Sequence, residues 1–158
     1  MGKMQKKKIG RLIFLILGLS IIVGVSLIEF FKPPREKYHA IDFENDSSWG
    51  AIFFTDYKKA IAQNDGWVKD AETIALRVAG YPNDDNIPPE KVDVEIDKDG
   101  KTIVTVLSRR LMDDSVVRQE TRVELIKNGD IWKIIWVGWR QQCARGSLGF
   151  GWTKSFCP

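Results

Sequence analysis

The chain has 158 residues, and its 24 lysine and arginine residues against 21 aspartate and glutamate residues give a formal net charge of +3. Five of the basic residues and none of the acidic ones precede residue 12. The remainder, with 19 basic and 21 acidic residues, is slightly acidic and gives no reason to expect nucleic-acid binding. About 120 residues follow the N-terminal segments, enough for one domain with its own core and too few for two.

Residues 12–31 are predicted to form a transmembrane helix. The uncharged run from Leu12 to Ile28 has 17 residues, close to the roughly 20 that span a bilayer. Residues 1–11 form a basic tail that favours the cytoplasmic side, so this pattern predicts a single-pass protein of the cell membrane with an extracytoplasmic C-terminal part. The expected lipid contacts lie in residues 12–31. A cleaved signal ending near Gly24 and Ser26 is the alternative, and the length of the apolar run argues against it.

Residues 32–46 are predicted to be a linker. Pro33 and Pro34 prevent the membrane helix from continuing and favour an extended chain, so the domain is expected to stand slightly off the bilayer. His39 is the only histidine and falls in this segment. A solvated side chain is a simpler interpretation of His39 than a catalytic base.

Residues 47–158 are predicted to form an extracytoplasmic domain that begins with two amphipathic helices. From Ser47 onward, apolar residues recur at intervals of three and four, which is typical of a helix with one buried face. Asp65-Gly66 interrupts the pattern, and a second helical stripe runs from Trp67 to Val78. Gly80, followed by proline, ends this second helix.

After Glu90 the apolar period changes to two, which indicates strands. Turn sequences, such as Asp99-Gly100 and Asn128-Gly129-Asp130, separate four strands of an antiparallel meander. The four strands are expected at Val92–Ile96, Lys101 to about Met112, Val116–Lys127, and Ile131 to about Gln142. Charges alternate along the third strand and are expected to face solvent, at Arg118, Glu120, Arg122 and Glu124.

The fourth strand is apolar on both sides, so we predict that both of its faces are covered. One face is expected to carry Trp132, Ile134 and Trp136, and the other Ile131, Ile135, Val137 and Trp139. Gly138 is the position at which a bulge is expected. The helices cover one face, and the C-terminal loop, a bend of the sheet or a second molecule covers the other.

Two helices followed by a four-stranded meander predict an α+β domain with a curved sheet around the helices. The order of elements, together with the hairpin Val123-Glu124-Leu125-Ile126-Lys127-Asn128-Gly129-Asp130-Ile131-Trp132-Lys133-Ile134, resembles the nuclear transport factor 2-like superfamily, or cystatin-like roll. That superfamily includes cone-shaped enzymes and also noncatalytic domains on single membrane helices. The resemblance covers about residues 47–142 and implies the noncatalytic, membrane-anchored type.

Cys143 and Cys157 are the only cysteines, and an oxidising compartment favours a disulfide between them. It closes a C-terminal loop in which glycines alternate with large apolar residues and cationic edges. This loop, with the neighbouring strand, supplies a candidate binding surface at Trp139, Arg145, Leu148, Phe150, Trp152 and Lys154. The simpler interpretation, which we prefer, is that the aromatic side chains of this loop fold back over the fourth strand, because the face that carries Trp139 needs a cover.

The first functional hypothesis is a noncatalytic binding or assembly module that contacts another envelope protein or a second copy, since tryptophan is prominent at protein interfaces. The second is a cone-shaped domain that binds or converts a small molecule. Asp56 and Tyr57 of the first helix are the candidate residues for the second, although Tyr57 is expected in the core and Asp56 at the surface. No catalytic residue, cofactor or metal site is predicted.

Overall fold

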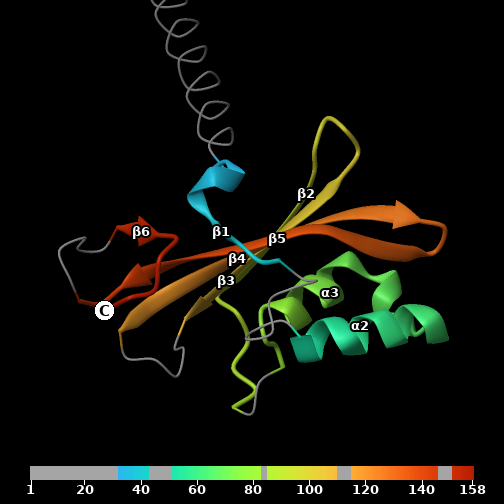
Figure 1. Ribbon diagram of the computed structural model, residues 1–158, viewed down its shortest axis with the longest axis horizontal. Helices are drawn as coiled ribbons and strands as arrows, with labels where there is room; N and C mark the ends of the chain where they lie inside the picture. Colours follow the sequence, from blue (N-terminus) through green and yellow to red (C-terminus); the bar gives the residue numbers. More distant parts are fainter. Residues whose placement is uncertain (1–31, 43–50, 83–84, 110–114, 146–150) are drawn as a thin grey trace, which may run out of the picture. The chain divides into compact units, whose positions relative to one another are not determined.

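Two helices, α2 (Ala51–Gln63) and α3 (Ala71–Val78), lie on one face of an antiparallel sheet (Figure 1). The computed structural model describes residues 32–42, 51–82, 85–109, 115–145 and 151–158. The two helices on an antiparallel sheet confirm the predicted α+β class. Residues 12–31, with the predicted membrane helix, lie outside this part, and no helix inside it combines the length and apolar character needed to cross a bilayer.

The second predicted helix is divided in two. A 3₁₀ helix, η2 (Gly66–Lys69), precedes α3, and Asp70 separates them with an extended backbone, φ −123° and ψ 116°. The Asp70 side chain accepts a hydrogen bond from the backbone N–H of Thr73, at 3.1 Å. An N-cap aspartate ends one helical segment and starts the next, because its carboxylate satisfies a backbone donor of the first turn.

The sheet contains the predicted meander, in the order β5-β4-β3-β2, and two further short strands. The four meander strands are β2 (Lys91–Ile96), β3 (Thr102–Arg109), β4 (Val116–Asn128) and β5 (Ile131–Cys143). The added strands are β1 (His39–Ala40) and β6 (Trp152–Thr153), and both pair antiparallel with β5. Among the described residues the sheet therefore has six strands rather than four, because these two segments satisfy backbone groups along the outer edge of β5.

Part of the predicted linker belongs to the domain. The compact unit runs from Arg35 to Pro158 and so begins before residue 47. After the 3₁₀ helix η1 (Arg35–Lys37), β1 pairs with β5, and Tyr38 and Ile41 are buried. Burial of these two side chains, together with strand pairing, offsets the entropy of ordering the segment.

A bulge in β5 changes which side chains share a face. Ile134 lies opposite Leu125 and Trp136 lies opposite Glu124, so Ile135 is the extra residue. Ile134 therefore joins Val137 on the helix-covered face, and the predicted grouping of Ile134 with Trp136 is wrong.

Gly138, where we expected the bulge, instead sits in regular register opposite Arg122. A Cβ at this position would collide with the Trp136 side chain, and it would lie 3.0 Å from the Cβ of Tyr38. The glycine therefore permits a close approach between the N-terminal segment and the sheet.

Tyr57 connects α2 to β5 next to the bulge at Ile135. Its hydroxyl donates to the carbonyl oxygen of Trp132 at 2.7 Å and accepts from the N–H of Ile134 at 3.0 Å. Its ring is buried, as predicted, and burial raises the pKa of this hydroxyl. The hydroxyl therefore supplies a partner to two backbone groups that the β4–β5 ladder does not use.

Replacing Tyr57 with phenylalanine is expected to destabilise the domain by about 1–3 kcal/mol, because two buried backbone groups lose their partner. Denaturant unfolding monitored by tryptophan fluorescence measures this change. The neighbouring Lys58→Ala variant alters an exposed position of α2 and is expected to stay within about 0.5 kcal/mol of the parent. Equal stability of the Tyr57→Phe variant and the parent would show that water replaces the hydroxyl.

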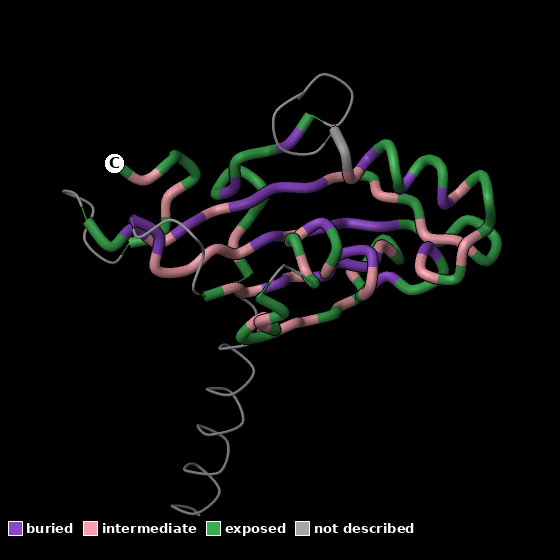
Figure 2. The backbone as a smooth tube through the Cα atoms, turned by 90° about the horizontal axis from the view of Figure 1, so that it is seen from below, coloured by how far each residue is buried: buried purple, intermediate pink, exposed green. Residues whose placement is uncertain are grey.

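The core lies between the helices and the middle strands. Long buried stretches follow the strands, whereas the turns are exposed (Figure 2). Side chains with no exposed surface include Val68, Ile74, Val104, Val106, Val123, Leu125 and Val137. The opposite face of the sheet carries charged and aromatic side chains instead.

Candidate functional site

The sheet face opposite the helices carries a set of charged and aromatic side chains, which we call the outer-face network. Its members are Arg35, Tyr38, Glu120, Arg122, Glu124, Trp136 and Arg140. The prediction that the charges of the third strand face open solvent is wrong for Glu124, which is 2% exposed. The N-terminal segment with η1 and Tyr38 covers this part of the face.

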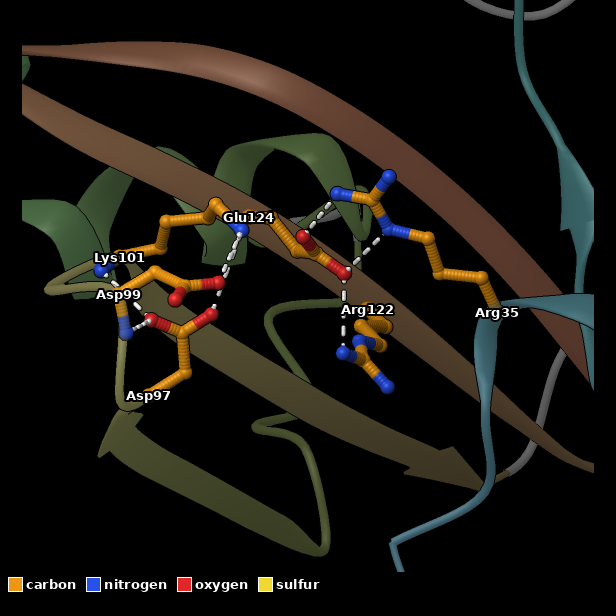
Figure 3. Close-up of polar contacts among 6 residues, drawn as sticks. All are labelled: Arg35, Asp97, Asp99, Lys101, Arg122 and Glu124. Atoms are coloured by element: carbon orange, nitrogen blue, oxygen red, sulfur yellow. Dashed lines mark hydrogen bonds and ion pairs between the residues drawn. The ribbon is translucent and has the colours of Figure 1, made fainter.

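Glu124 is the centre of one half of this network (Figure 3). Arg35 donates from Nε to Oε1 at 2.8 Å and also bonds the second carboxylate oxygen through Nη2, while Arg122 Nη2 lies 2.9 Å from Oε1. Burial alone raises the pKa of Glu124, but the bond from Arg35 and the charge of Arg122 outweigh it and lower the pKa. The carboxylate is therefore held in its charged form.

Glu120 is the centre of the other half. The Tyr38 hydroxyl donates to its Oε1, and Arg140 binds both carboxylate oxygens, at 2.8 and 3.0 Å. The Arg140 guanidinium also lies 5.2 Å from the ring centre of Tyr38 and 4.4 Å from that of Trp152. Burial, followed by the hydrogen bond to Glu120, raises the pKa of Tyr38 well above its ordinary value. The N-terminal segment and β6 thus meet on the same arginine.

A third polar group forms the β2–β3 turn and is drawn in Figure 3. Asp97 accepts hydrogen bonds from the backbone N–H of Asp99 at 2.8 Å and from that of Lys101 at 2.9 Å. The Lys101 ammonium lies 3.5 Å from Asp97 and 3.2 Å from Asp99. Gly100 supplies the left-handed backbone, with φ +78°. These contacts fix the shape of the turn.

Trp139 does not form the exposed binding surface that we predicted. Its side chain is 6% exposed and belongs to the core cluster. His39 from β1 lies 4.9 Å away and Phe156 lies 5.1 Å away, measured between ring centres. His39 of β1 and Phe156 of the C-terminal loop therefore cover this tryptophan, as the folded-back interpretation of the loop predicts for one of its aromatic side chains, and His39 is itself exposed.

The C-terminal segment Cys143–Pro158, which we call the stapled tail, is closed by the predicted disulfide between Cys143 and Cys157. Gln141 donates from its side chain to the carbonyl oxygen of Ser155 at 3.1 Å, and β6 holds the tail to β5. Of the predicted surface residues, Arg145, Trp152 and Lys154 are exposed. Leu148 and Phe150 lie outside the described residues.

Phe156 is an exposed aromatic residue that the sequence patterns did not predict as part of the candidate surface. It is 80% exposed, although its ring contacts Trp139. The sequence feature that could have indicated this residue is its position directly before Cys157, since the disulfide limits how far the Phe156 side chain can move. Trp152 lies against Arg140 of the outer-face network, whereas Phe156 lies against Trp139 of the core cluster, so the tail presents aromatic side chains on both sides of β5.

In the part of the chain that the structure describes, no three histidine, cysteine, aspartate or glutamate side chains gather as a metal site would require. Searches against known protein families, curated proteins and solved structures found no match to this chain.

Proposed function

We propose that this chain is a single-pass membrane protein whose extracytoplasmic domain binds another envelope protein through the stapled tail. Residues 12–31 are the anchor and the basic residues 1–11 stay in the cytoplasm. Two features support this orientation. One is the concentration of basic residues before the apolar run, and the other is the Cys143–Cys157 disulfide, which is typical of oxidising compartments.

The exposed side chain of Phe156 is the observation that carries the binding role. An aromatic ring in solvent costs free energy, and here the adjacent disulfide and the contact with Trp139 hold it in place. Interface residues that contribute most to affinity are often such preorganised aromatic side chains, because little conformational entropy is lost on binding. Lys154 and Arg145 are also exposed on this tail, so a partner with an apolar pocket and an acidic rim fits this surface.

Site-specific photocrosslinking in intact membranes tests this proposal. A photoreactive amino acid at position 156 is expected to give one discrete adduct, whereas the same group at Lys58, exposed on α2, is expected to give none. Phe156→Ala is expected to weaken binding to the identified partner about tenfold, or about 1.4 kcal/mol.

Lys154→Glu is a second test, because reversing this charge is expected to repel an acidic rim and to slow association. Its matched control is Lys58→Glu, the same charge change away from the tail. An adduct formed equally at positions 58 and 156, or full affinity in both Phe156→Ala and Lys154→Glu, would contradict the proposal.

The resemblance to the nuclear transport factor 2-like roll remains a prediction, and the cone-shaped small-molecule domain remains the alternative function. That alternative requires an acid or base directed into the fold. Asp56, the carboxylate considered for this role, is exposed on α2, and Tyr57 uses its hydroxyl on the backbone of β5. These placements favour the binding module.

A further inference from the structure

The chain between the predicted membrane helix and the domain is very short. The structure holds η1 and β1 on the sheet, so only Lys32, Pro33 and Pro34 separate residue 31 from the domain. Four residue steps reach at most roughly 14 Å, even when fully extended. The predicted linker of 32–46 would have allowed a far greater distance. If residues 12–31 span the membrane, the surface around Arg35 lies beside the bilayer.

The β2–β3 hairpin projects on the same side of the sheet as η1, opposite α2 and α3 (Figure 1). The charge of Asp97, in this hairpin, acts on Arg35 of η1, which supports this placement. The hydrogen bond to Glu124 has the largest effect in raising the pKa of Arg35, and the charges of Glu124, Glu36 and Asp97 contribute further. Asp97 is the first residue after β2, so the tip of the hairpin lies within electrostatic range of Arg35.

The tip of this hairpin exposes an aliphatic side chain. Ile96 is 74% exposed and is followed closely by the exposed Lys98. Lys101 pairs with the carboxylates of Asp97 and Asp99, so the turn is not strongly acidic. By strand register Ile96 shares a face with Thr102 and Leu125, whereas Ile126 of β4, which is 39% exposed, lies on the outer face of the sheet. Aliphatic side chains next to lysine suit the boundary between lipid headgroups and acyl chains.

We propose that the tip of the β2–β3 hairpin rests in the interface of the same bilayer that residues 12–31 span, with Ile96 among the lipid headgroups. This inference depends on the membrane anchoring proposed above. Two attachments, the anchor and the hairpin, then hold the domain in one orientation instead of letting it rotate on its tether. The stapled tail is presented to its partner from that fixed orientation.

Depth-dependent fluorescence quenching with the full chain tests this contact. An Ile96→Cys variant is labelled with an environment-sensitive fluorophore without reductant, so that the Cys143–Cys157 disulfide stays closed. The labelled chain is reconstituted in vesicles of phosphatidylcholine and phosphatidylglycerol, with and without lipids that carry a quencher in the acyl chain. Quenching is expected to be several-fold greater at position 96 than for the same label in Lys58→Cys. Lys98→Cys is a second position on the tip, and both replaced side chains are exposed.

Vesicle flotation after an alkaline carbonate wash separates the two proposals. A chain that no longer floats contradicts the membrane anchor itself. A chain that floats, with labels at 96 and 98 quenched no more than at 58, overturns the hairpin contact and leaves the anchor standing. A blue-shifted label at position 96 that lipid quenchers do not reach also overturns it, because a second copy of the chain then covers the tip.

Discussion

Reduction of the Cys143–Cys157 disulfide is expected to lower the free energy of unfolding by about 3 kcal/mol. The bond closes a loop of 15 residues, and cross-linking a loop of that length removes about this much free energy from the unfolded chain on the entropy model. For a domain of this size, the change corresponds to a decrease of roughly 10 °C in the melting temperature. Thermal unfolding with and without reductant measures it.

The double variant Cys143→Ser with Cys157→Ser is the control for this experiment. It is expected to melt at the temperature of the reduced parent and not to respond to reductant. Release of the tail is also expected to expose Trp139, which Phe156 now contacts, and to shift tryptophan fluorescence to longer wavelength. Identical melting of the oxidised and reduced parent would mean that the bridge does not stabilise the domain.

Local sequence patterns predicted much of the fold. The period of two after Glu90 and the glycine turns located the four long strands to within a few residues, because these signals depend only on neighbours along the chain. The pairing of Cys143 with Cys157 followed from there being only two cysteines. The division before α3 was missed, although Asp70, which directly precedes α3, is one of the residue types preferred at a helix N-cap.

Features that depend on distant segments were not predictable in the same way. β1 has only two residues and forms because β5 offers an unpaired edge. The extra residue at Ile135 reverses the faces of Ile131–Ile134, and nothing in the local alternation marks it. Alternation places Glu124 on a face of the sheet, but whether that face is covered depends on Arg35, 89 positions earlier in the chain.

The same distinction applies to the candidate surface: local patterns predicted the exposure of some residues, but not contacts between distant segments. Trp152 and Lys154 are exposed as expected for residues next to glycines in a closed loop. Trp139 was included in the candidate surface, but the folded-back loop that we also predicted covers it, since Phe156 of this loop and His39 of β1 both lie against its ring. The contact of His39 was not predictable in this way, because it depends on the pairing of β1 with β5.

Glu124→Gln is expected to destabilise the domain by about 3 kcal/mol, since removing one partner of a buried ion pair leaves the other without compensation. The Glu124 side chain is 3% exposed, and the variant leaves Arg122, whose side chain is 12% exposed, with one charged neighbour fewer. Arg35→Met is expected to cost less, because the Arg35 side chain is 45% exposed and its partner keeps Arg122. Chemical denaturation of the two single variants and the double variant gives the coupling between these residues.

The pH dependence of the unfolding free energy tests whether the Glu124→Gln variant is less stable because it lacks the charge of Glu124. The pKa of Glu124 is lowered by folding from its ordinary value of 4.5, so its charged form contributes stability above that value, and the contribution is lost as pH falls through the folded-state pKa. The difference in unfolding free energy between parent and Glu124→Gln is therefore expected to be constant above about pH 6 and to shrink below pH 4.5. Asp56→Asn, which removes an exposed carboxylate of α2, is the matched control. A difference that stays constant down to acid unfolding would mean that the glutamine fails through its shape and hydrogen bonds, and that the outer-face network does not depend on the charge of Glu124.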